Sequence, residues 1–189
     1  MRKCRRQSCR TPLPTAKLSD KWQAKGFCGL DCMAGHGMDK AKTIRERQHK
    51  TETKTRRDKI KSKTEWLNEA QTAFNAYIRE RDRLMGLGCI SCGVTKPDIQ
   101  YHAGHYRTRK AAPQLRFDED NCHRQCSACN LHLSGNLIKY RMVLQLRIGD
   151  KDLERIESDN SEARFTIDDA KRIKAEYKKK LTQLKMRQP

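Results

Sequence analysis

The fold of this chain depends on the sequence Cys89-Ile-Ser-Cys92, which is separated by 33 residues from Cys126-Ser-Ala-Cys129-Asn130. Each Cys-x-x-Cys pair has the spacing of a zinc knuckle, in which one tight turn presents two thiolates to the same ion. The insert between the pairs is longer than a minimal zinc ribbon needs, so it must build a structure of its own. We therefore predict a structural zinc site made of Cys89, Cys92, Cys126 and Cys129, which fixes both ends of that insert.

The insert carries polar groups that a structural zinc site does not need. The segment Ile99-Gln-Tyr-His102-Ala-Gly-His105 predicts a short strand that ends in a histidine. A basic loop follows, then Asn121, and Asn130 comes directly after the second pair on an expected short helix that also holds His132. Hydrolysis of a phosphodiester needs a base for water and a cation for developing charge, so these residue types fit that chemistry.

Composition points to an anionic partner. The chain of 189 residues has 42 Lys and Arg against 23 Asp and Glu, a formal net charge of +19. Cations at this density favour nucleic acid, because each one near a phosphate releases a condensed counterion. Only 35% of the residues are hydrophobic, which predicts small folded units rather than one large core.

The cysteines indicate metal ligation. There are nine of them, and no apolar run follows Met1, so we expect neither a signal peptide nor a membrane-spanning segment. Thiols in a reducing compartment stay reduced, which favours zinc over disulfides. A second structural zinc is predicted from Cys4, Cys9, Cys28 and Cys32, with His36 as a substitute ligand. The alternative is free cysteines in a disordered arm.

Four segments are expected along the chain. Residues 1–38 form an N-terminal zinc-binding unit, residues 39–86 a basic and then amphipathic helix, residues 87–149 the zinc module, and residues 150–189 a helical basic tail. Residues 40–63 hold eleven Lys or Arg and a net charge of +8. They are either a solvated linker helix or a helix that contacts DNA, with contacts predicted from Arg56, Arg57 and Lys59.

Apolar spacing predicts four further helices. An amphipathic helix starts near Glu65 and ends near Met85; its aromatic residues are predicted to be core that packs on the zinc module, and the same helix is our first candidate for a dimer surface. A short helix over 137–148 is closed by Gly149, and a weak helix follows around Leu153. The last helix begins at Thr166, which pairs with Asp169 as an imperfect capping box.

The motifs within 89–136 resemble the HNH, or ββα-metal, nuclease family. Its pattern is a His at a strand end, an Asn five positions before Cys-x-x-Cys, and an Asn or His directly after it. A closer similarity is to the phage NinG (Rap) recombination proteins. It covers His102-Ala-Gly-His-Tyr-Arg107, the segment 115–126, the segment 129–136 and the four N-terminal cysteines. The resemblance implies an α+β fold: a small zinc-stapled ββα-metal (HNH-like) module flanked by long basic helices, plus an N-terminal zinc knuckle unit.

The resemblance also implies residue roles. His105 would be the general base, Asn121 would hold its imidazole in orientation, and Asn130 would be a ligand of one catalytic Mg²⁺ or Mn²⁺. Many members of the family carry Asp or His directly before the base, whereas this chain has Gly104. We expect His102, or alternatively His132, to replace that ligand. The predicted phosphate contacts around the site are Arg107, Arg109, Lys110, Arg116 and Arg124.

The function implied is a metal-dependent DNA endonuclease, an HNH-type phosphodiester hydrolase, acting on branched recombination intermediates such as a Holliday junction or D-loop. It would work in the cytoplasm of a bacterial host, with other recombination proteins as further partners. Paired nicks need paired sites, which favours a homodimer. The alternative function is a noncatalytic zinc protein that binds nucleic acid and assists recombination. A zinc adaptor that recruits a recombinase through residues 1–38 is a third possibility, and a thiol redox role is the least favoured.

Overall fold

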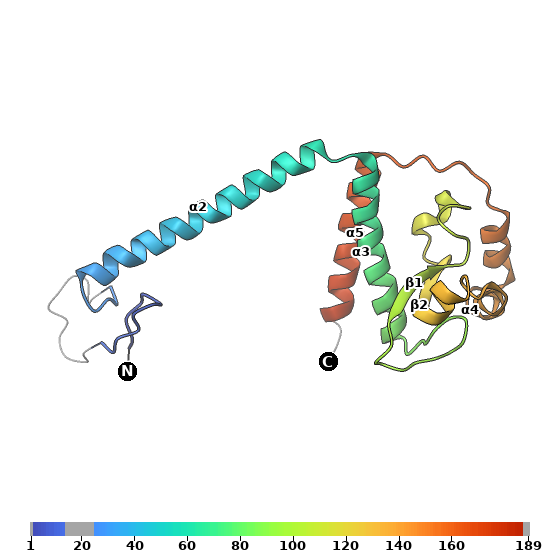
Figure 1. Ribbon diagram of the computed structural model, residues 1–189, viewed down its shortest axis with the longest axis horizontal. Coiled ribbons are helices and arrows are strands. Elements are labelled where there is room, and N and C mark those ends of the chain that lie inside the picture. Colours follow the sequence, from blue (N-terminus) through green and yellow to red (C-terminus); the bar gives the residue numbers. More distant parts are fainter. Residues whose placement is uncertain (1, 14–24, 187–189) are drawn as a thin grey trace. The chain divides into compact units, whose positions relative to one another are not determined.

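The computed structural model describes residues 2–13 and 25–186 and shows an α+β protein with two compact units, Met1–Lys61 and Ser62–Pro189 (Figure 1). Helices predominate, and the sheet in the second unit has two strands. The predicted boundary at residue 38 falls inside a continuous helix, so the first unit extends to residue 61. No helix within the described ranges has both the length and the apolar composition to cross a bilayer.

The first unit combines a short N-terminal segment with one long helix. Lys3 and Pro12 form an isolated antiparallel bridge next to the Cys4 cluster. Helix α2 (Leu30–Ile60) follows, and among its residues, all of which are described, Gly35 alone is buried. The polar helix predicted over 40–63 is therefore present, although it begins ten positions earlier. Its charged surface is solvated nearly all round.

The second unit begins with helix α3 (Lys63–Leu84), which starts at a complete capping box. The Ser62 hydroxyl accepts a hydrogen bond from the Glu65 backbone N–H at 3.2 Å, and the Glu65 carboxylate accepts one from the Ser62 N–H at 2.8 Å. The helix ends with Gly86 at a φ of +69°, a left-handed conformation that glycine adopts without strain. The amphipathic helix predicted over 65–85 is confirmed.

Helix α5 (Ile167–Met186) lies side by side with α3, although the two helices are far apart in the sequence (Figure 1). Its N-terminus is capped as predicted: the Thr166 hydroxyl accepts from the Asp169 N–H at 3.1 Å, and the Asp169 carboxylate accepts from the Thr166 N–H at 3.0 Å. The rings of Phe74 and Tyr177 meet edge to face with centroids 4.8 Å apart. The shared core contains Trp66, Ala70, Ala73, Phe74, Ile78, Cys122, Ala170, Ile173 and Tyr177.

This pairing confirms that the aromatic residues of α3 are core, but it contradicts the dimer surface predicted on the same helix. The apolar stripe of α3 is buried against α5 within one chain, so it is unavailable to a second copy. Exposed apolar side chains lie instead on helix α4 (Leu137–Ser158), where Ile138, Met142 and Leu146 are 81%, 63% and 86% exposed. They recur at a spacing of four and so share one helical face.

The sheet is an antiparallel hairpin of β1 (Tyr101–His105) and β2 (Cys122–Cys126). His105 pairs with Cys122, and Gly104 pairs with His123. The two members of each pair lie on the same face of the hairpin, and the two pairs lie on opposite faces. Between the strands runs a loop with the short 3₁₀ helix η1 (Pro113–Phe117). After β2 comes η2 (Ala128–His132), a single π-helical turn at the position of the short helix expected around Asn130.

Helix α4 is divided by Gly149, whose φ of +80° interrupts the helical backbone. The predicted end of the helix at this glycine and the second helical segment around Leu153 are both confirmed. Tyr140 and Leu144, from the first segment, pack with Ile90 and Leu153 in a second small core. The Tyr140 hydroxyl donates to the Gly104 carbonyl at 2.8 Å, which ties α4 to the end of β1.

Candidate active site

A cleft of about 420 Å³ opens where the end of β1, the turn η2 and helix α3 meet. It brings together His105 and Asn130, two of the residues predicted from sequence, with Arg109 from the loop after β1. Asn75, which the sequence analysis did not single out, contributes a polar side chain from α3. The full lining is Asn75, Ala103, His105, Thr108, Arg109, Asn130, Ser134, Gly135 and Leu137.

The His105 imidazole is held by a backbone carbonyl. Its Nε2 lies 3.0 Å from the Arg116 carbonyl oxygen, which can only accept, so Nε2 carries the hydrogen and Nδ1 keeps the lone pair. Cys122 Sγ lies 3.5 Å from that Nδ1. Burial lowers the pKa of His105 below 6.5, and nearby Arg109 also lowers it, while the Arg116 carbonyl acts in the opposite direction. The imidazole is therefore neutral near pH 7 and able to accept a proton.

Asn121 holds the loop that follows His105 rather than the imidazole itself. Its side chain is fully buried, and its Oδ1 accepts from the Arg107 N–H at 2.8 Å. Its Nδ2 donates to the carbonyls of Arg107 and Leu115 at 3.0 and 3.2 Å. The orienting role expected for Asn121 is therefore indirect, through the backbone on either side of the cleft.

Gly104, which occupies the position of a metal ligand in many HNH nucleases, faces the side chain of Gln125. A Cβ at position 104 would overlap the Gln125 amide, so this face has no space for a ligating side chain. The Gln125 amide nitrogen donates to the Ser91 hydroxyl at 2.7 Å and to the Gly135 carbonyl at 2.6 Å. The glycine therefore allows Gln125 to fasten the hairpin to the knuckle and to the segment after η2.

His102 and His132, the two expected replacements, lie outside the cleft lining. His102 leaves β1 on the face opposite to His105, since side chains alternate along a strand. Its Nε2 is buried and has no hydrogen-bond partner within the described residues. His132 is exposed at the end of η2. Neither position supports the prediction that one of them joins Asn130 as a ligand.

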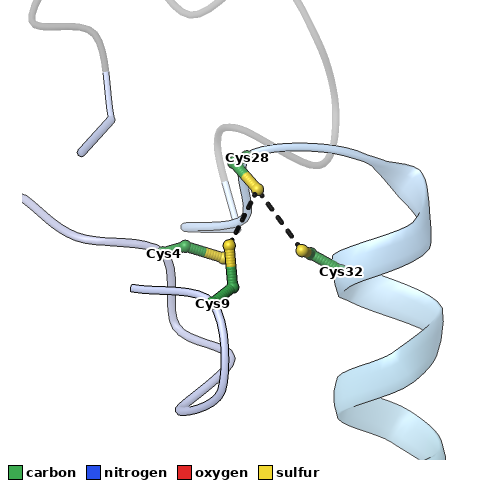
Figure 2. Close-up of side chains that lie close together, drawn as sticks. All are labelled: Cys4, Cys9, Cys28 and Cys32. Atoms are coloured by element: carbon green, nitrogen blue, oxygen red, sulfur yellow. Dashed lines mark hydrogen bonds between the residues drawn. The ribbon is translucent and has the colours of Figure 1, made fainter. Parts of the chain in front are cut away.

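Both predicted cysteine clusters are assembled and could bind structural zinc. In each set, the four Sγ atoms lie within 4.8 Å of one another, which a tetrahedral thiolate site requires. In the first unit, Cys28 Sγ lies 3.6 Å from Cys9 and 3.3 Å from Cys32, as Figure 2 shows. His36 is not part of that set; it stacks on Phe27 with ring centroids 5.2 Å apart.

The second cluster connects the knuckle before β1 to the one after β2. Cys92 and Cys126 Sγ atoms are 3.8 Å apart, and the Cys129 N–H donates to Cys126 Sγ at 3.5 Å. The Asn136 amide donates to Cys129 Sγ at the same distance. Hydrogen bonds of this kind stabilise a thiolate, so the second set also fits zinc. The cluster consists of Cys89, Cys92, Cys126 and Cys129.

Three of the five arginines and lysines predicted to contact phosphate near the site instead have structural roles. Arg107 donates to carbonyls at the C-terminal end of α4. Arg116 donates to the Gln71 side chain at 2.8 Å and to the backbone of α3. Arg124 stacks on Tyr101, with its guanidinium carbon 3.5 Å from the ring centroid. Arg109, in the cleft, and its neighbour Lys110 remain exposed.

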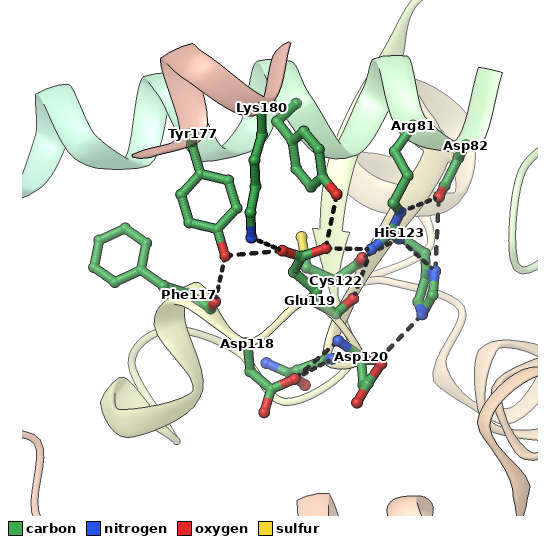
Figure 3. A network of polar contacts seen from close by, with 12 residues as sticks. Arg81, Asp82, Phe117, Asp118, Glu119, Asp120, Cys122, His123, Tyr177 and Lys180 are labelled. Atoms are coloured by element: carbon green, nitrogen blue, oxygen red, sulfur yellow. Dashed lines mark hydrogen bonds and ion pairs between the residues drawn. The ribbon is translucent and has the colours of Figure 1, made fainter. Parts of the chain in front are cut away.

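A polar network that the sequence analysis missed joins β2 to α3 (Figure 3). Asp82 is fully buried, and it accepts from the Arg124 N–H at 2.6 Å and from the Arg81 guanidinium at 2.8 Å. Burial would raise the pKa of Asp82, but hydrogen bonds from His123 and Arg81 lower it to about 2. Asp82 follows Phe74 and Ile78 at a spacing of four, so it lies on the apolar stripe of α3. A charged residue in that position was the sequence signal that could have indicated this network.

Comparison with known proteins covers both units. The family profile described as Bacteriophage Lambda NinG protein matches residues 1–187. The protein called Protein ninG in Salmonella phage P22 is 42% identical, over 97% of this chain and 94% of the relative. Protein ninG of Escherichia phage lambda is also 42% identical, over 97% and 93%. Protein ninG of Escherichia phage 933W is 50% identical over 72% of this chain and 66% of the relative.

No solved structure matches the chain. The family match extends from the first cysteine cluster through the cleft to the end of α5, and two relatives agree with it over nearly their whole length. The chain therefore belongs to the NinG family of bacteriophage proteins.

Proposed function

We propose that this protein is a metal-dependent DNA endonuclease with an HNH-type centre, acting on branched recombination intermediates in the cytoplasm of the phage's host. The observation that carries the proposal is the cleft, which brings together a half-buried neutral histidine, Asn130 and the cation Arg109. A hairpin followed by a helical turn, with cysteine knuckles before and after it, supplies the order of elements that the HNH resemblance implies.

His105 is the general base in this proposal. Because Nε2–H is committed to the Arg116 carbonyl, Nδ1 is the nitrogen that can accept a proton from the attacking water. Arg109 attracts the anionic phosphate into the cleft. Asn121 keeps the loop between them in place through its three hydrogen bonds to backbone. No step of this proposed reaction requires His102 or His132.

The oxygen donors of the cleft fit a hard divalent ion. Asn130 and Ser134 offer an amide and a hydroxyl oxygen, which suit Mg²⁺ or Mn²⁺, with water and phosphate oxygens as the remaining ligands. Such an ion, when bound, would act as a Lewis acid that stabilises the leaving 3′ oxygen. The cysteine clusters are chemically distinct, since thiolates select zinc.

DNA contacts are proposed from the exposed cations of both units. Arg56, Arg57 and Lys59 are exposed on α2. A groove of about 870 Å³ in the first unit adds Arg5, Arg6, Gln7, Ser8, His36, Asp39, Lys40, Thr43, Ile44 and Arg47 to the available surface. Near the cleft, Arg109 and Lys110 take this role, whereas Arg107, Arg116 and Arg124 position the fold.

The proposed branched substrate rests on the resemblance to the NinG recombination proteins, and the proposed homodimer rests on the symmetry of that substrate. Symmetric resolution of a four-way junction requires two centres, so the proposal includes a dimer. The exposed face formed by Ile138, Met142 and Leu146 is the apolar surface of the second unit best suited to it.

The decisive experiment offers purified protein linear duplex and four-way junction DNA, with and without Mg²⁺ or Mn²⁺. We expect metal-dependent nicking of the junction that is lost in His105→Ala while DNA binding remains. Tight binding without cleavage under any divalent ion would instead support a noncatalytic protein that assists recombination.

A further inference from the structure

Asn75 enters the cleft from outside the zinc-stapled hairpin. It lies on α3, thirty positions before His105, and its side chain lines the same cavity as His105 and Asn130. It is half-buried rather than freely solvated. The wall opposite the hairpin therefore contains a neutral amide, and the hydrogen bonds around that amide determine which of its two ends faces the cleft.

A chain of hydrogen bonds fixes the orientation of the Asn75 amide. The Arg116 Nε donates to the Gln71 Oε1 at 2.8 Å, and the Gln71 Nε2 donates to the Asn75 Oδ1 at 2.7 Å. Gln71 is buried, with 4% of its surface exposed, so water does not compete for these groups. The chain runs from the loop between the strands, along α3, to the cleft.

The direction of this series of hydrogen bonds is determined by which groups can donate and which can accept. A guanidinium has donors and no acceptor, so the Gln71 oxygen must face Arg116 and the Gln71 nitrogen must face Asn75. The Asn75 oxygen then accepts, and its NH₂ group is left with no hydrogen-bond partner within the described residues. An arginine that cannot accept a hydrogen bond thereby makes Asn75 a donor toward the cleft.

Arg116 controls both walls of the cleft at once. Its carbonyl oxygen accepts from His105 Nε2 at 3.0 Å, and its side chain begins the chain to Asn75. The base and the amide are thus held by the same residue. A rigid donor aimed at a site of developing charge stabilises a transition state without reorganisation.

We propose that Asn75 is a further catalytic residue, whose NH₂ group donates a hydrogen bond to a non-bridging oxygen of the scissile phosphate, and that Gln71 is its positioning residue. This deepens the function proposed above and rests on it. Phosphate oxygens are acceptors, and the amide nitrogen is not a metal ligand. Asn75 and Asn130 therefore have different roles: Asn75 binds the phosphate directly, and Asn130 holds the divalent ion.

The first test measures single-turnover nicking of junction DNA at saturating protein. Asn75→Ala should slow cleavage by about a hundredfold to a thousandfold, the order expected for one lost preorganised donor, with DNA affinity nearly unchanged. Asn75→Asp should be at least as slow, because its carboxylate repels the phosphate. Thr72→Ala, an exposed neighbour on α3, is the matched control and should cleave at the wild-type rate. An Asn75→Asp variant that cleaves normally at a lower Mn²⁺ concentration would show a metal ligand and overturn the proposal.

The second test does not depend on cleavage. In ¹⁵N-labelled full-length protein, the Asn75 NH₂ signal is identified by its absence in Asn75→Ala. It is then followed while a short duplex is added without divalent ions. We expect this signal to shift on saturation, and the Asn68 NH₂ signal on the same helix to stay in place.

Gln71→Glu tests the positioning role. A glutamate at 71 can accept from Arg116 but cannot donate to Asn75, so the Asn75 amide should turn its oxygen to the cleft. Its NH₂ response to DNA should then disappear and nicking should slow as in Asn75→Ala, while the thermal unfolding midpoint stays within a few degrees of wild type. The inference is overturned if the Asn75 NH₂ signal of the wild type does not shift when DNA is added. It is also overturned if this signal shifts equally in the wild type and in Gln71→Glu. If the wild type shows the shift but nicks no DNA, the nuclease proposal fails and the phosphate contact stands.

Discussion

The Glu119 carboxylate lies 2.8 Å from the Lys180 ammonium, which joins the loop before β2 to α5 across 61 positions of sequence (Figure 3). The same carboxylate accepts from the hydroxyls of Tyr77 at 3.0 Å and Tyr177 at 3.2 Å. Burial alone would raise the pKa of Glu119. The hydrogen bonds from Lys180 and Tyr77 lower this pKa by more, so the net shift is downward. One carboxylate therefore connects α3, α5 and the hairpin.

Replacing that carboxylate should weaken the second unit. Glu119→Ala removes the acceptor that two tyrosine hydroxyls and an ammonium share, so we expect a loss of about 2 kcal/mol in the free energy of unfolding. Urea denaturation followed by circular dichroism measures it. Glu176→Gln, which removes an exposed carboxylate 3.0 Å from Lys180, is the control and should cost about 0.5 kcal/mol or less. Equal losses in both variants would contradict a central role for Glu119.

Asp82 predicts a specific acid sensitivity. Its folded pKa of about 2 lies below the ordinary value of 3.8, so its contribution to stability is complete above about pH 4 and is lost as the pH falls toward 2. The shift corresponds to about 2 kcal/mol. Unfolding free energies measured between pH 5 and 2 should show this decline, and Asp82→Asn should flatten it. The exposed Asp98→Asn should leave it unchanged; a decline that persists in Asp82→Asn would refute the assignment.

The pH dependence of nicking should follow His105. A general base works only when unprotonated, and burial places the pKa of His105 below its ordinary 6.5. The cleavage rate should therefore fall as the pH is lowered, with the midpoint of the decline below pH 6.5. Single-turnover rates at fixed Mn²⁺ and ionic strength test this. A rate that already halves at pH 7 or above would mean that another group is the base.

Zinc content should separate the two cysteine clusters. We expect two zinc ions per wild-type chain, and one in each of Cys28→Ser and Cys126→Ser, by metal analysis of purified protein. Cys126→Ser should also unfold the hairpin and abolish nicking. Cys28→Ser should leave the unfolding of the second unit unchanged. Two zinc ions retained in either variant would contradict a four-thiolate site at that cluster.

The charge on α2 should appear in the salt dependence of DNA binding. Replacing Arg56, Arg57 and Lys59 together by Gln should reduce the slope of log K against log salt by up to about 3, since each phosphate contact contributes about 0.9. Fluorescence anisotropy between 50 and 300 mM salt measures the slope. Replacing Lys151, an exposed lysine of the second unit, tests whether the effect is specific; an unchanged slope in the triple variant would exclude α2 from the interface.

Local patterns carried most of the predictable structure. Closely spaced cysteine pairs, Cys-x-x-Cys in the second cluster and slightly wider pairs in the first, predicted both clusters because ligand spacing is a property of a few neighbouring residues. The apolar period predicted α3, and Thr166 with Asp169 predicted the start of α5. The end of the first α4 segment followed from Gly149, since only its backbone takes a φ of +80° without strain.

Contacts between segments far apart in the chain could not be predicted from the sequence. Nothing near Asn75 indicates that α3 forms a wall of the cleft, because this depends on how the helix packs on the hairpin. The prediction of phosphate contacts failed for a related reason. Arg107 and Arg124 carry the same charge as Arg109, but their guanidiniums bind backbone carbonyls and a tyrosine ring within the fold. Spacing alone also placed His102 with His105, although strand alternation sends the two side chains to opposite faces.

The pairing of α3 with α5 also sets an order of events during synthesis. Lys174 reaches back 105 positions to Glu69, so the part of the apolar stripe of α3 that packs on α5 has no partner until that much more chain has been made. At about 5–20 residues per second, this delay lasts about 5–20 seconds. During this interval the stripe is open to chaperones and proteases, and the wall that carries Asn75 is unsupported. Nascent chains on the ribosome should therefore be unable to cut DNA until α5 has emerged and docked.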